Sequence, residues 1–512
     1  MSIGKTLWRG RRVLYSLALL FGVTAAHAAG TCTAGNIAQL RACADNLSSY
    51  DGITLSADMA CTGSDCCAGN GGALIGINGL SGKVFDGGGH RILRQASQRT
   101  CPAVGISQAS NITVRNAVFD EDLNAAPCDP TDNCVSTVDV SGSSNVTLDT
   151  VTVSNGKAYV VRGWGVNGFT VQNSSVLNAG IIGIYVGHDD YAPSYKVGIY
   201  NSSVIGARTN GIAIESANGV QDGDNAIVGN LIEGNHWHGL WRDANGAIFP
   251  GGQLLIVMAN HLLVKDNTIG DGYCDTCGPN SIGGIELGAA EHPNSLHSIQ
   301  FVNNLIYNQT GYAAYANQGV NTDSSISFSG NRSVSNGFGI SVPNAALSGN
   351  AELPTKVLLD WEAPNSWPTG WSTWQLCSSG AQVVRWCPGS GEAMGGQCAL
   401  RLMTASTSCN DGWQGVWTQG AYQQVSPGTT VYLSGWRRNG SYTGKVCLVF
   451  QDSAGTETGA TCRDYTPVDQ WRYQGAPIVQ ATAPAGTKTF AVKFALNSAY
   501  GVADLDNFKV AW

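Results

Sequence analysis

Short segments in which apolar and polar residues alternate recur between about residues 100 and 345, and Asn or Gly commonly stands where they end. Asn111-Ile-Thr-Val, Asn145-Val-Thr-Leu and Ile326-Ser-Phe are three of them. An alternation with a period of two predicts β-strands that have one buried face. No stretch of roughly ten residues with helical periodicity separates these segments, so the pattern argues against a β–α–β fold.

One short apolar sequence motif recurs at a fixed interval. Gly183-Ile-Tyr-Val is followed by Gly211-Ile-Ala-Ile, Gly239-Leu-Trp-Arg and Gly284-Ile-Glu-Leu, and the first intervals are 211 − 183 = 28 and 239 − 211 = 28 residues. The same interval of 28 residues separates Val176 from Val204, Val204 from Ile232, and Ile306 from Val334. A fixed period in this range predicts a solenoid, in which one supersecondary unit is stacked on itself.

Two repeats are longer than the others. Ile232 to Ile269 and Ile269 to Ile306 each span 37 residues, an excess of 37 − 28 = 9 residues. The insertions are expected near Phe249-Pro-Gly-Gly and near Asp271-Gly-Tyr-Cys. Insertions in solenoids form loops that often lie on the binding side, so the expected rung that starts with Gly239-Leu-Trp-Arg would lie between two such loops.

Four asparagines stand at nearly the same corner of successive repeats: Asn230, Asn267, Asn304 and Asn331. Stacked asparagines can form a hydrogen-bonded ladder and tolerate left-handed turn geometry. This segment resembles the right-handed parallel β-helix superfamily, which includes pectate lyases, polygalacturonases and other polysaccharide depolymerases. The resemblance implies an all-β parallel β-helix catalytic domain over residues 76–345, while the fold alone does not define the chemistry.

Residues 30–75 are expected to form a disulfide-containing cap on the N-terminal end of the solenoid. The apolar residues that follow Asn36 share one face of a helix: Ile37, Leu40, Cys43 and Leu47. A short amphipathic helix would cover the hydrophobic core that a solenoid exposes at its end.

Residues 1–29 have the features of a secretory signal peptide. Basic residues are followed by an apolar run from Val13 to Ala25 and by the small-residue cleavage site Ala26-His-Ala28. Arg11-Arg12 also allows a twin-arginine signal, although the rest of that motif is missing. No later apolar run approaches the length of about 20 residues that a membrane anchor needs. The protein is therefore expected to be secreted, either to the periplasm or out of the cell.

The sixteen cysteines predict disulfide bonds in an exported chain. Ten of them precede residue 300 and six follow residue 370, and these even numbers fit two separately closed domains. Their pairing cannot be read from the sequence. Cys274-Asp-Thr-Cys277 has the spacing of half a zinc site, but no second CxxC accompanies it, so a loop disulfide is favoured.

Residues 346–356 are expected to form a linker, after which the composition changes. Residues 357–512 hold ten of the fourteen tryptophans. Three segments resemble the jelly-roll carbohydrate-binding modules: Val425 to Trp436, Trp471-Arg-Tyr, and Asp504-Leu-Asp-Asn-Phe-Lys-Val510. The resemblance implies a β-sandwich with a structural Ca²⁺ held by Asp506 and Glu362, because hard carboxylate ligands suit that ion. No organic cofactor is expected.

Acidic residues gather on the expected rungs of the solenoid. Neighbouring strands lie about 4.8 Å apart and alternate side chains face outward. We count positions along each repeat from its Gly, which is position zero. Position four is then Glu215 in one repeat and Asp243 in the next, so the two are expected side by side. If Ala158 is position zero of an earlier repeat, Arg162 also falls at position four. Glu286, at position two, is expected one rung further on.

These acids suit glycoside hydrolysis, which needs one carboxyl as an acid and a second as a base or nucleophile. Because close carboxyls raise one pKa, the pair can supply a proton donor. We expect Asp243 to be the general acid and Glu215 or Glu286 to be its partner. The alternative is that these acids only form ion pairs on an exposed sheet.

Aromatic and basic residues and histidines surround the expected acids. Sugar rings stack on aromatic faces, although the same rings could instead pack loops against the solenoid. Two histidines that are two residues apart face one way in an extended chain, where one could orient the general acid; a zinc site there lacks a third ligand. The candidate substrate-binding residues are Arg162, Trp164, Tyr185, His188, His236, His238, Trp241 and Arg242.

Arg242 also stands out because it falls at an inward position that neighbouring rungs fill with Ile214 and Leu287. Breaks of the inside–outside pattern are more expected at functional sites than elsewhere. The sequence therefore points to this rung as the centre of the site.

Three functions remain open for this chain. The favoured one is a monomeric polysaccharide hydrolase that carries a carbohydrate-binding module and binds neither nucleic acid nor membrane. The second is a polysaccharide lyase, which needs a cationic base next to a uronate; the net charge of −8 gives no long-range attraction to such a polyanion. The third is a non-catalytic glycan-binding protein. The cations available to a lyase are Lys157, Arg162, Lys196, Arg208 and Arg242.

Overall fold

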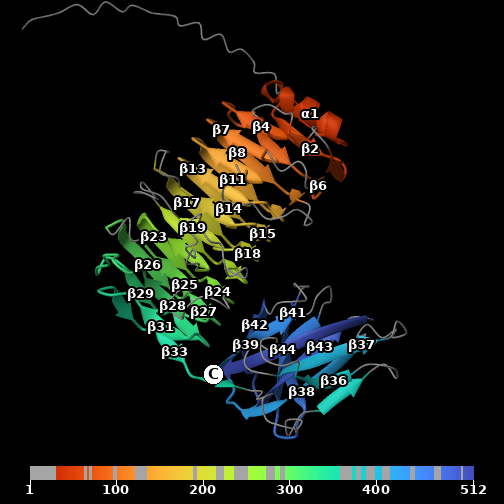
Figure 1. Cartoon of the computed structure of the whole chain (residues 1–512), viewed down its shortest axis with the longest axis vertical. Coiled ribbons are helices and arrows are strands. Elements are labelled where there is room, and N and C mark those ends of the chain that lie inside the picture. Colours follow the sequence, from red (N-terminus) through yellow and green to blue (C-terminus); the bar gives the residue numbers. More distant parts are fainter. Residues whose placement is uncertain are drawn as a thin grey trace, which may run out of the picture.

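The computed structural model describes residues 30–62, 66–67, 72–95, 101–121, 135–187, 193–214, 224–235, 252–272, 283–288, 294–357, 372–375, 382–387, 398–405, 415–438, 444–465, 474–497 and 500–512. These residues form a long stack of coils and an antiparallel β-sandwich that packs beside its C-terminal part (Figure 1). The signal peptide predicted at residues 1–29 lies outside the described residues.

The stack consists of three parallel sheets. One turn of the solenoid, called a coil here, contributes a strand to each sheet in turn. Sheet A has twelve strands: β1 (Cys32–Ala34), β2 (Gly52–Leu55), β5 (Val84–Asp86), β8 (Ser110–Arg115), β11 (Ser144–Asp149), β14 (Asn167–Gln172), β17 (Tyr195–Tyr200), β20 (Asn225–Val228), β23 (Ala259–Lys265), β26 (Leu296–Val302), β29 (Ser327–Ser329) and β32 (Ala346–Ser348).

Sheet B has eleven strands: β3 (Met59–Cys61), β6 (Arg91–Arg94), β9 (Val118–Glu121), β12 (Thr152–Ser154), β15 (Ser175–Leu177), β18 (Ser203–Ile205), β21 (Leu231–Glu233), β24 (Thr268–Gly270), β27 (Leu305–Tyr307), β30 (Arg332–Val334) and β33 (Ala351–Leu353). Sheet C has ten: β4 (Ile75–Asn78), β7 (Val104–Ser107), β10 (Val138–Ser141), β13 (Val161–Trp164), β16 (Ile184–Val186), β19 (Ile212–Ile214), β22 (Leu254–Ile256), β25 (Gly283–Leu287), β28 (Tyr312–Ala316) and β31 (Phe338–Ser341).

This arrangement confirms the predicted all-β parallel β-helix. The 28-residue period matches the strand register, because Val176, Val204 and Ile232 are paired on successive strands of sheet B. The two 37-residue coils are also correct, since Ile232 pairs with Ile269 and Ile269 with Ile306. Inward side chains stack from coil to coil and exclude solvent, which makes one continuous core.

The last interval of the predicted period is wrong by one residue. Ile306 pairs with Ser333, and Val334 pairs with Tyr307 on the outer side of sheet B. The outer position is apolar because the C-terminal domain packs there: Val334 and Tyr307 share a buried cluster with Tyr432. An apolar residue at this point therefore reports the domain contact and not the inside of the coil.

A buried polar ladder runs along the corner between sheets A and B. The side-chain Oδ1 atoms of Asn267, Asn304 and Asn331 each accept a hydrogen bond from the backbone N–H of the ladder residue one coil earlier, at 2.9–3.0 Å. In the same way, Asn230 Oδ1 accepts a hydrogen bond from the backbone N–H of Ser202, and Ser202 Oγ accepts one from the backbone N–H of Ser174. The predicted asparagine stack is thus present, and serines continue it toward the N-terminus.

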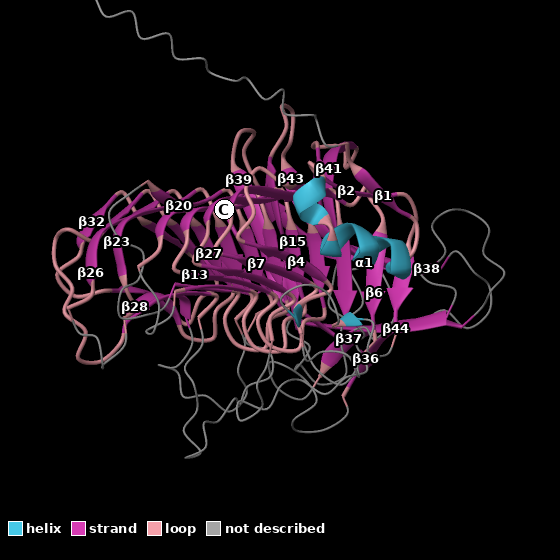
Figure 2. Ribbon diagram, turned by 90° about the horizontal axis from the view of Figure 1, so that it is seen from above, coloured by secondary structure: helices cyan, strands magenta, loops and turns pink. Residues whose placement is uncertain are grey.

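The N-terminal end is covered by the helix α1 (Ile37–Asp45), followed by a short 3₁₀ turn at Leu47–Ser49. Asn36 caps the helix, because its side chain accepts a hydrogen bond from the backbone N–H of Gln39 at 3.0 Å. Leu40 and Cys43 are buried against the first coils, and Figure 2 shows α1 lying across that end of the stack. The predicted capping helix is therefore present.

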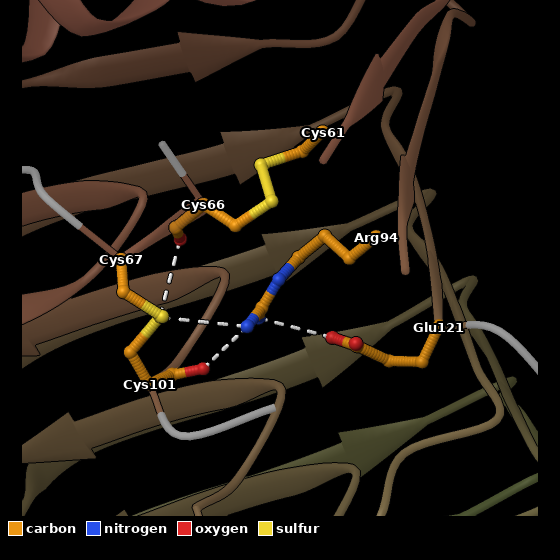
Figure 3. Close-up of a disulfide and its surroundings, with 6 residues drawn as sticks. All are labelled: Cys61, Cys66, Cys67, Arg94, Cys101 and Glu121. Carbon is orange, nitrogen blue, oxygen red and sulfur yellow. Dashed lines mark hydrogen bonds and ion pairs between the residues drawn. A yellow bond between two sulfur atoms is a disulfide. The ribbon is translucent and has the colours of Figure 1, made fainter. Parts of the chain in front are cut away.

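A buried ion pair joins sheet B near this end (Figure 3). The guanidinium of Arg94, from β6, lies 3.0 Å from the carboxylate of Glu121, from β9, and the side chains are 2% and 3% exposed. Arg94 also donates a hydrogen bond to the carbonyl oxygen of Cys101 at 2.6 Å. Two disulfides, Cys61–Cys66 and Cys67–Cys101, lie beside it.

The C-terminal domain is a sandwich of two antiparallel sheets, which confirms the predicted β-sandwich. Sheet D contains β36 (Gln382–Trp386), β37 (Ala399–Ala405), β44 (Tyr500–Ala511), β39 (Thr430–Arg438) and β42 (Gln474–Thr482), with β34 (Thr355–Val357) paired to β44. Sheet E contains β35 (Ser372–Gln375), β38 (Gly415–Gln424), β43 (Thr489–Asn497), β40 (Gly444–Gln451) and β41 (Glu457–Tyr465).

The linker predicted at residues 346–356 is wrong. Residues 346–353 include β32 and β33, which complete sheets A and B, and β34 already belongs to the sandwich. Only Pro354 stands between β33 and β34. The Ala, Ser and Gly residues of this segment suit tight coil corners as well as they suit a flexible connection.

Five disulfides lie among the described residues, three near the start of the solenoid and two in the sandwich. The pairs, which the sequence left open, include Cys32–Cys43 beside α1, and Cys387–Cys398 and Cys447–Cys462 in the sandwich. Cys274 and Cys277 lie outside the described residues. Within the part of the chain that the structure describes, no helix is long and apolar enough to cross a membrane.

Candidate functional site

The outer face of sheet C carries the predicted substrate-binding residues that the structure describes. One column of this face passes through paired residues on seven successive strands. They are Asp139, Arg162, Tyr185, Ala213, Leu255, Glu286 and Tyr315. Arg162, Tyr185 and Glu286 therefore share one column, and Trp164 lies two residues further along the strand of Arg162.

Arg162 is held from two sides. Its Nε donates a hydrogen bond to Asp139 Oδ1 at 3.1 Å, and a second guanidinium nitrogen contacts the other carboxylate oxygen. The guanidinium lies 3.6 Å from the centre of the Trp164 ring and 5.9 Å from that of Tyr159. The Tyr159 and Tyr185 rings lie 4.8 Å apart. The aromatic residues and Arg162 thus form one packed cluster, in which Tyr185 is 8% exposed and the Arg162 side chain 11% exposed.

Glu286 is brought to this face but is covered, with an exposure of 1%. Its Oε1 accepts a hydrogen bond from Asn317 Nδ2 at 2.8 Å. Tyr315 pairs with it on the next strand, and burial together with the Glu286 carboxylate raises the pKa of the Tyr315 hydroxyl above its usual value. Glu286 is therefore built into a polar cluster of its own.

The rung that the sequence assigned to Gly239-Leu-Trp-Arg is wrong. The strand between β19 and β25 is β22, since Ile214 pairs with Ile256 and Ile256 with Leu287. The inward position expected for Arg242 is filled by Ile256, which is fully buried. The apparent break of the inside–outside pattern at Arg242 therefore came from the wrong strand assignment. The strand register also gives no support for placing Asp243 one rung from Glu215 or Glu286.

The repeat alignment of Arg162 is wrong as well. Counting from Ala158 and Gly183 sets Arg162 opposite Gly187, whereas the strand register pairs it with Tyr185. Most of the remaining predicted site residues belong to connections between the sheets of the solenoid. Residues 234–253 connect β21 to β22 and residues 271–282 connect β24 to β25, so each insertion follows a strand of sheet B and precedes one of sheet C. Gly239 belongs to the first of these connections, so the expectation that the insertions flank a rung starting at Gly239 is wrong. Outside the described residues lie Glu215, Asp243, His188, His236, His238, Trp241 and Arg242.

The described cations that were proposed for lyase chemistry belong to several strands and connections of the solenoid. Arg162 is paired with Asp139, as described above. Lys196 lies on β17 of sheet A. Lys157 and Arg208 lie in the connections that follow β12 and β18.

The proposed calcium ligands are only partly placed. Asp506 lies on β44 and pairs with Trp436 of β39 in the backbone register, while Glu362 lies outside the described residues. Asp504, two residues earlier, is bound by Arg401 Nε at 2.6 Å. Among the described residues, no group of three His, Cys, Asp or Glu side chains is arranged to hold a metal ion. The calcium site remains a prediction.

A second acidic cluster, which the sequence did not reveal, lies on the outer face of sheet B under the sandwich. Glu233 and Asp271 are 8% and 3% exposed. The Tyr307 hydroxyl donates a hydrogen bond to Glu233 Oε2 at 2.6 Å and lies 3.3 Å from Asp271 Oδ2. Asn308 Nδ2 donates to Asp271 Oδ1 at 2.8 Å and to the carbonyl oxygen of Gly435, in the sandwich, at 3.2 Å.

This acidic cluster is a domain contact and not an open catalytic pair. Burial raises the pKa of Glu233, and burial together with the charge of Glu233 raises the pKa of Asp271 well above its usual value. The charge of Arg437 in the sandwich opposes both shifts, and that of Arg463 opposes the shift of Glu233. Gly270 makes room for the Tyr307 ring, because a Cβ there would come within 2.0 Å of it.

Raising the pH is expected to loosen the docking of the sandwich on the solenoid. The docked state holds its protons to a higher pH than the undocked state, in which the exposed carboxyls titrate near about 4. Between these two pKa ranges the docked state binds more protons, so its stability falls as the pH rises through this window. Amide hydrogen exchange at Gly435 and Arg437 and the small-angle scattering radius, measured from pH 4 to 8, would report this change.

The matched variant is Asp271→Asn, which keeps an acceptor for Asn308 and removes the ionisable group. We expect it to reduce the pH dependence while the sandwich stays docked at neutral pH. Exchange that is independent of pH in the unmodified protein, or slower exchange at higher pH, would contradict this account of the cluster.

No protein-family model matches the chain, and no curated protein matches it in sequence. Solved structures are similar to it at low identity. The enzymatically active domain of tailspike protein 4 of bacteriophage CBA120 aligns with 94% of this chain at 10% identity and a TM-score of 0.25, and the aligned part spans 66% of that protein's length.

Two carbohydrate-binding modules align with part of the chain. A structure of CBM4 covers 30% of this chain and 94% of its own length, at 17% identity and a TM-score of 0.22. The CBM22-1 xylan-binding domain of Paenibacillus barcinonensis Xyn10C covers 31% of this chain and 97% of its own length, at 16% identity and a TM-score of 0.22. At these values the similarity assigns no activity to the chain.

Proposed function

We propose that this protein is a secreted polysaccharide-degrading enzyme, a glycoside hydrolase whose substrate lies across the outer face of sheet C. The observation that carries the proposal is the cluster in which the partly exposed Arg162 and Trp164 stack and the buried Tyr185 packs behind them, since an aromatic ring beside a guanidinium suits a sugar chain. The two long insertions lead into β22 and β25 of the same sheet, two and three strands beyond the strand of Tyr185. The sandwich would bring the enzyme to its polymer as a carbohydrate-binding module.

In this proposal Asp243 is the general acid and Glu215 its partner. Asp243 belongs to the long connection between β21 and β22, and Glu215 directly follows β19, so both belong to segments that border sheet C. The burial of Glu286 and its hydrogen bond to Asn317 favour a positioning role for Glu286 over direct contact with substrate. An acid and a base or nucleophile are the minimum that hydrolysis requires.

The Asp243→Asn and Glu215→Gln variants are each expected to lower polysaccharide cleavage by about 10²–10⁴-fold, the usual contribution of a general acid or base. Release of reducing ends from a panel of polysaccharides measures the activity. Retention in glycan-containing gels checks that binding by the sandwich persists. Asp266→Asn is the control, because Asp266 is exposed on the corner between sheets A and B and should leave cleavage unchanged.

A polysaccharide lyase is the second candidate function. It would be supported by an unsaturated, ultraviolet-absorbing product, and such a product would refute the hydrolase. The pairing of Arg162 with Asp139 favours the hydrolase, because a guanidinium that already binds a carboxylate of the protein is a poor partner for a uronate. Absence of cleavage of every polysaccharide would refute both enzymes and leave a glycan-binding protein.

A further inference from the structure

A groove with a volume of about 800 Å³ lies on the outer face of sheet A, a different face of the solenoid from sheet C. Its floor follows one register column through Ala226, Leu263 and Gln300, on three neighbouring strands. The groove therefore runs across the strands, along the axis of the solenoid. The described residues on its sides include Tyr200, Asp224, His261 and Ser298.

The N-terminal part of the groove is bordered by an aromatic ring. Gly198 precedes Ala226 in the floor column, and a Cβ on Gly198 would come within 2.2 Å of Tyr200 Cε2. The Tyr200 ring therefore lies against the backbone of its own strand, and only a glycine allows this. The Tyr200 ring is also one of the groups that line the groove.

The rim of the groove is polar. Asp224, His261 and Gln300 are exposed. His261 and Ser298, the third residues of β23 and β26, have left-handed backbone conformations, with φ of 55° and 53°. The rim therefore offers carboxylate, imidazole, amide and hydroxyl groups beside an aromatic ring and the apolar side chain of Leu263.

We propose that this groove is a second glycan-binding site, which takes a neutral oligosaccharide chain aligned with the solenoid axis. Sugars present apolar ring faces and many hydroxyls, which match one aromatic ring and several hydrogen-bonding groups. The described lining residues include one carboxylate, Asp224, and no Lys or Arg, and a carboxylate disfavours an anionic glycan. The choice of a glycan rests on the proposed function, whereas the groove itself does not.

Hydroxyl-radical footprinting of the full chain tests the proposal, because it locates the ligand on individual side chains. The probes are cellohexaose, xylohexaose and mannohexaose, with hexagalacturonate as the anionic comparison. At least one neutral hexasaccharide is expected to protect Tyr200 and His261 from oxidation. Ala226→Trp fills the floor and is expected to abolish this protection and to weaken binding at this site by about tenfold or more.

Thr147→Trp is the matched control, since Thr147 occupies the same column two strands before Gly198. It adds the same bulk outside the groove and should leave the protection intact. Protection by hexagalacturonate alone, no protection by any neutral probe, or equal protection in Ala226→Trp would overturn the proposal. Cleavage without a footprint at Tyr200 would refute the groove alone, while a footprint without any cleavage would refute the proposed enzyme alone.

Discussion

The Arg94→Met variant is expected to lose about 3–5 kcal/mol of folding stability, because removal of one partner leaves the other charge of a buried pair uncompensated. The Glu121 carboxylate, 3% exposed, would lose the guanidinium that lies 3.0 Å from it. Met keeps much of the volume of the arginine stem, so the loss reports charge more than packing. The urea midpoint and hydrogen exchange on β6 and β9 would measure it.

Two further variants separate charge from position. Arg91 lies on the same strand and pairs with Asp120, but its side chain is 47% exposed, so Arg91→Met is expected to cost less than about 1 kcal/mol. The double variant Arg94→Met/Glu121→Leu replaces both buried charges by apolar groups and should recover most of the loss. A similar loss in Arg91→Met and Arg94→Met, or no recovery in the double variant, would contradict the account of this pair.

Strand alternation and period were enough to predict the solenoid and its two long coils, because inward positions admit only side chains that pack in a continuous core. The same requirement explains the error at Gly239-Leu-Trp-Arg. That segment keeps the 28-residue spacing, but Leu254 and Ile256 provide two apolar inward residues, and both are fully buried in β22. An arginine at an inward position was itself evidence that Gly239-Leu-Trp-Arg is not a strand of sheet C. The 28-residue spacing alone could not distinguish this segment from the true strand.

The acidic cluster beneath the sandwich could not be found from the solenoid sequence, because its contacts come from residues far along the chain. Asn308 contacts Gly435, a separation of 127 residues. A local signal does exist: Leu305, Tyr307 and Val334 are apolar or aromatic at outer positions of sheet B. Apolar residues on both faces of a strand indicate that a second layer covers it, which places the sandwich on sheet B.

The candidate site was only partly predictable for a related reason. Strand residues such as Arg162, Tyr185 and Glu286 follow from the period, because side chains on a regular strand alternate between two faces. Residues in the inserted connections, Asp243 among them, have no such rule. The sequence therefore locates the face of the solenoid on which a site is built more securely than it locates the acids that would act there.

The Asn267→Ala variant is expected to lose about 3 kcal/mol of stability, because it leaves several buried polar groups without their partner. Asn267 Oδ1 accepts from the backbone N–H of Asn230 at 2.9 Å and from its side chain at 3.0 Å. Asn267 Nδ2 donates to the Ile227 carbonyl at 2.8 Å and to Asn304 Oδ1 at 2.9 Å. Solvent cannot replace these bonds, since Asn267 is 1% exposed.

The ladder itself supplies the controls. Serines occupy equivalent corners, where Ser202 accepts from the N–H of Ser174 and donates to the Tyr200 carbonyl, so Asn267→Ser should lose roughly half as much as Asn267→Ala. Asn350→Ala, at the half-buried end of the ladder, should also lose less. Equal losses in all three variants would show that the amide ladder does not act as described.

A further consequence follows from the one-dimensional order of the coils. Each coil contacts only its neighbours, so a defect at Asn267 weakens the coupling between the coils before it and those after it. Urea unfolding of Asn267→Ala is therefore expected to broaden or to separate into two steps, with exchange at the Asn230 amide faster than in the unmodified protein. A single transition that is merely shifted, with an unchanged slope, would argue that the coils on both sides remain coupled through their apolar core alone.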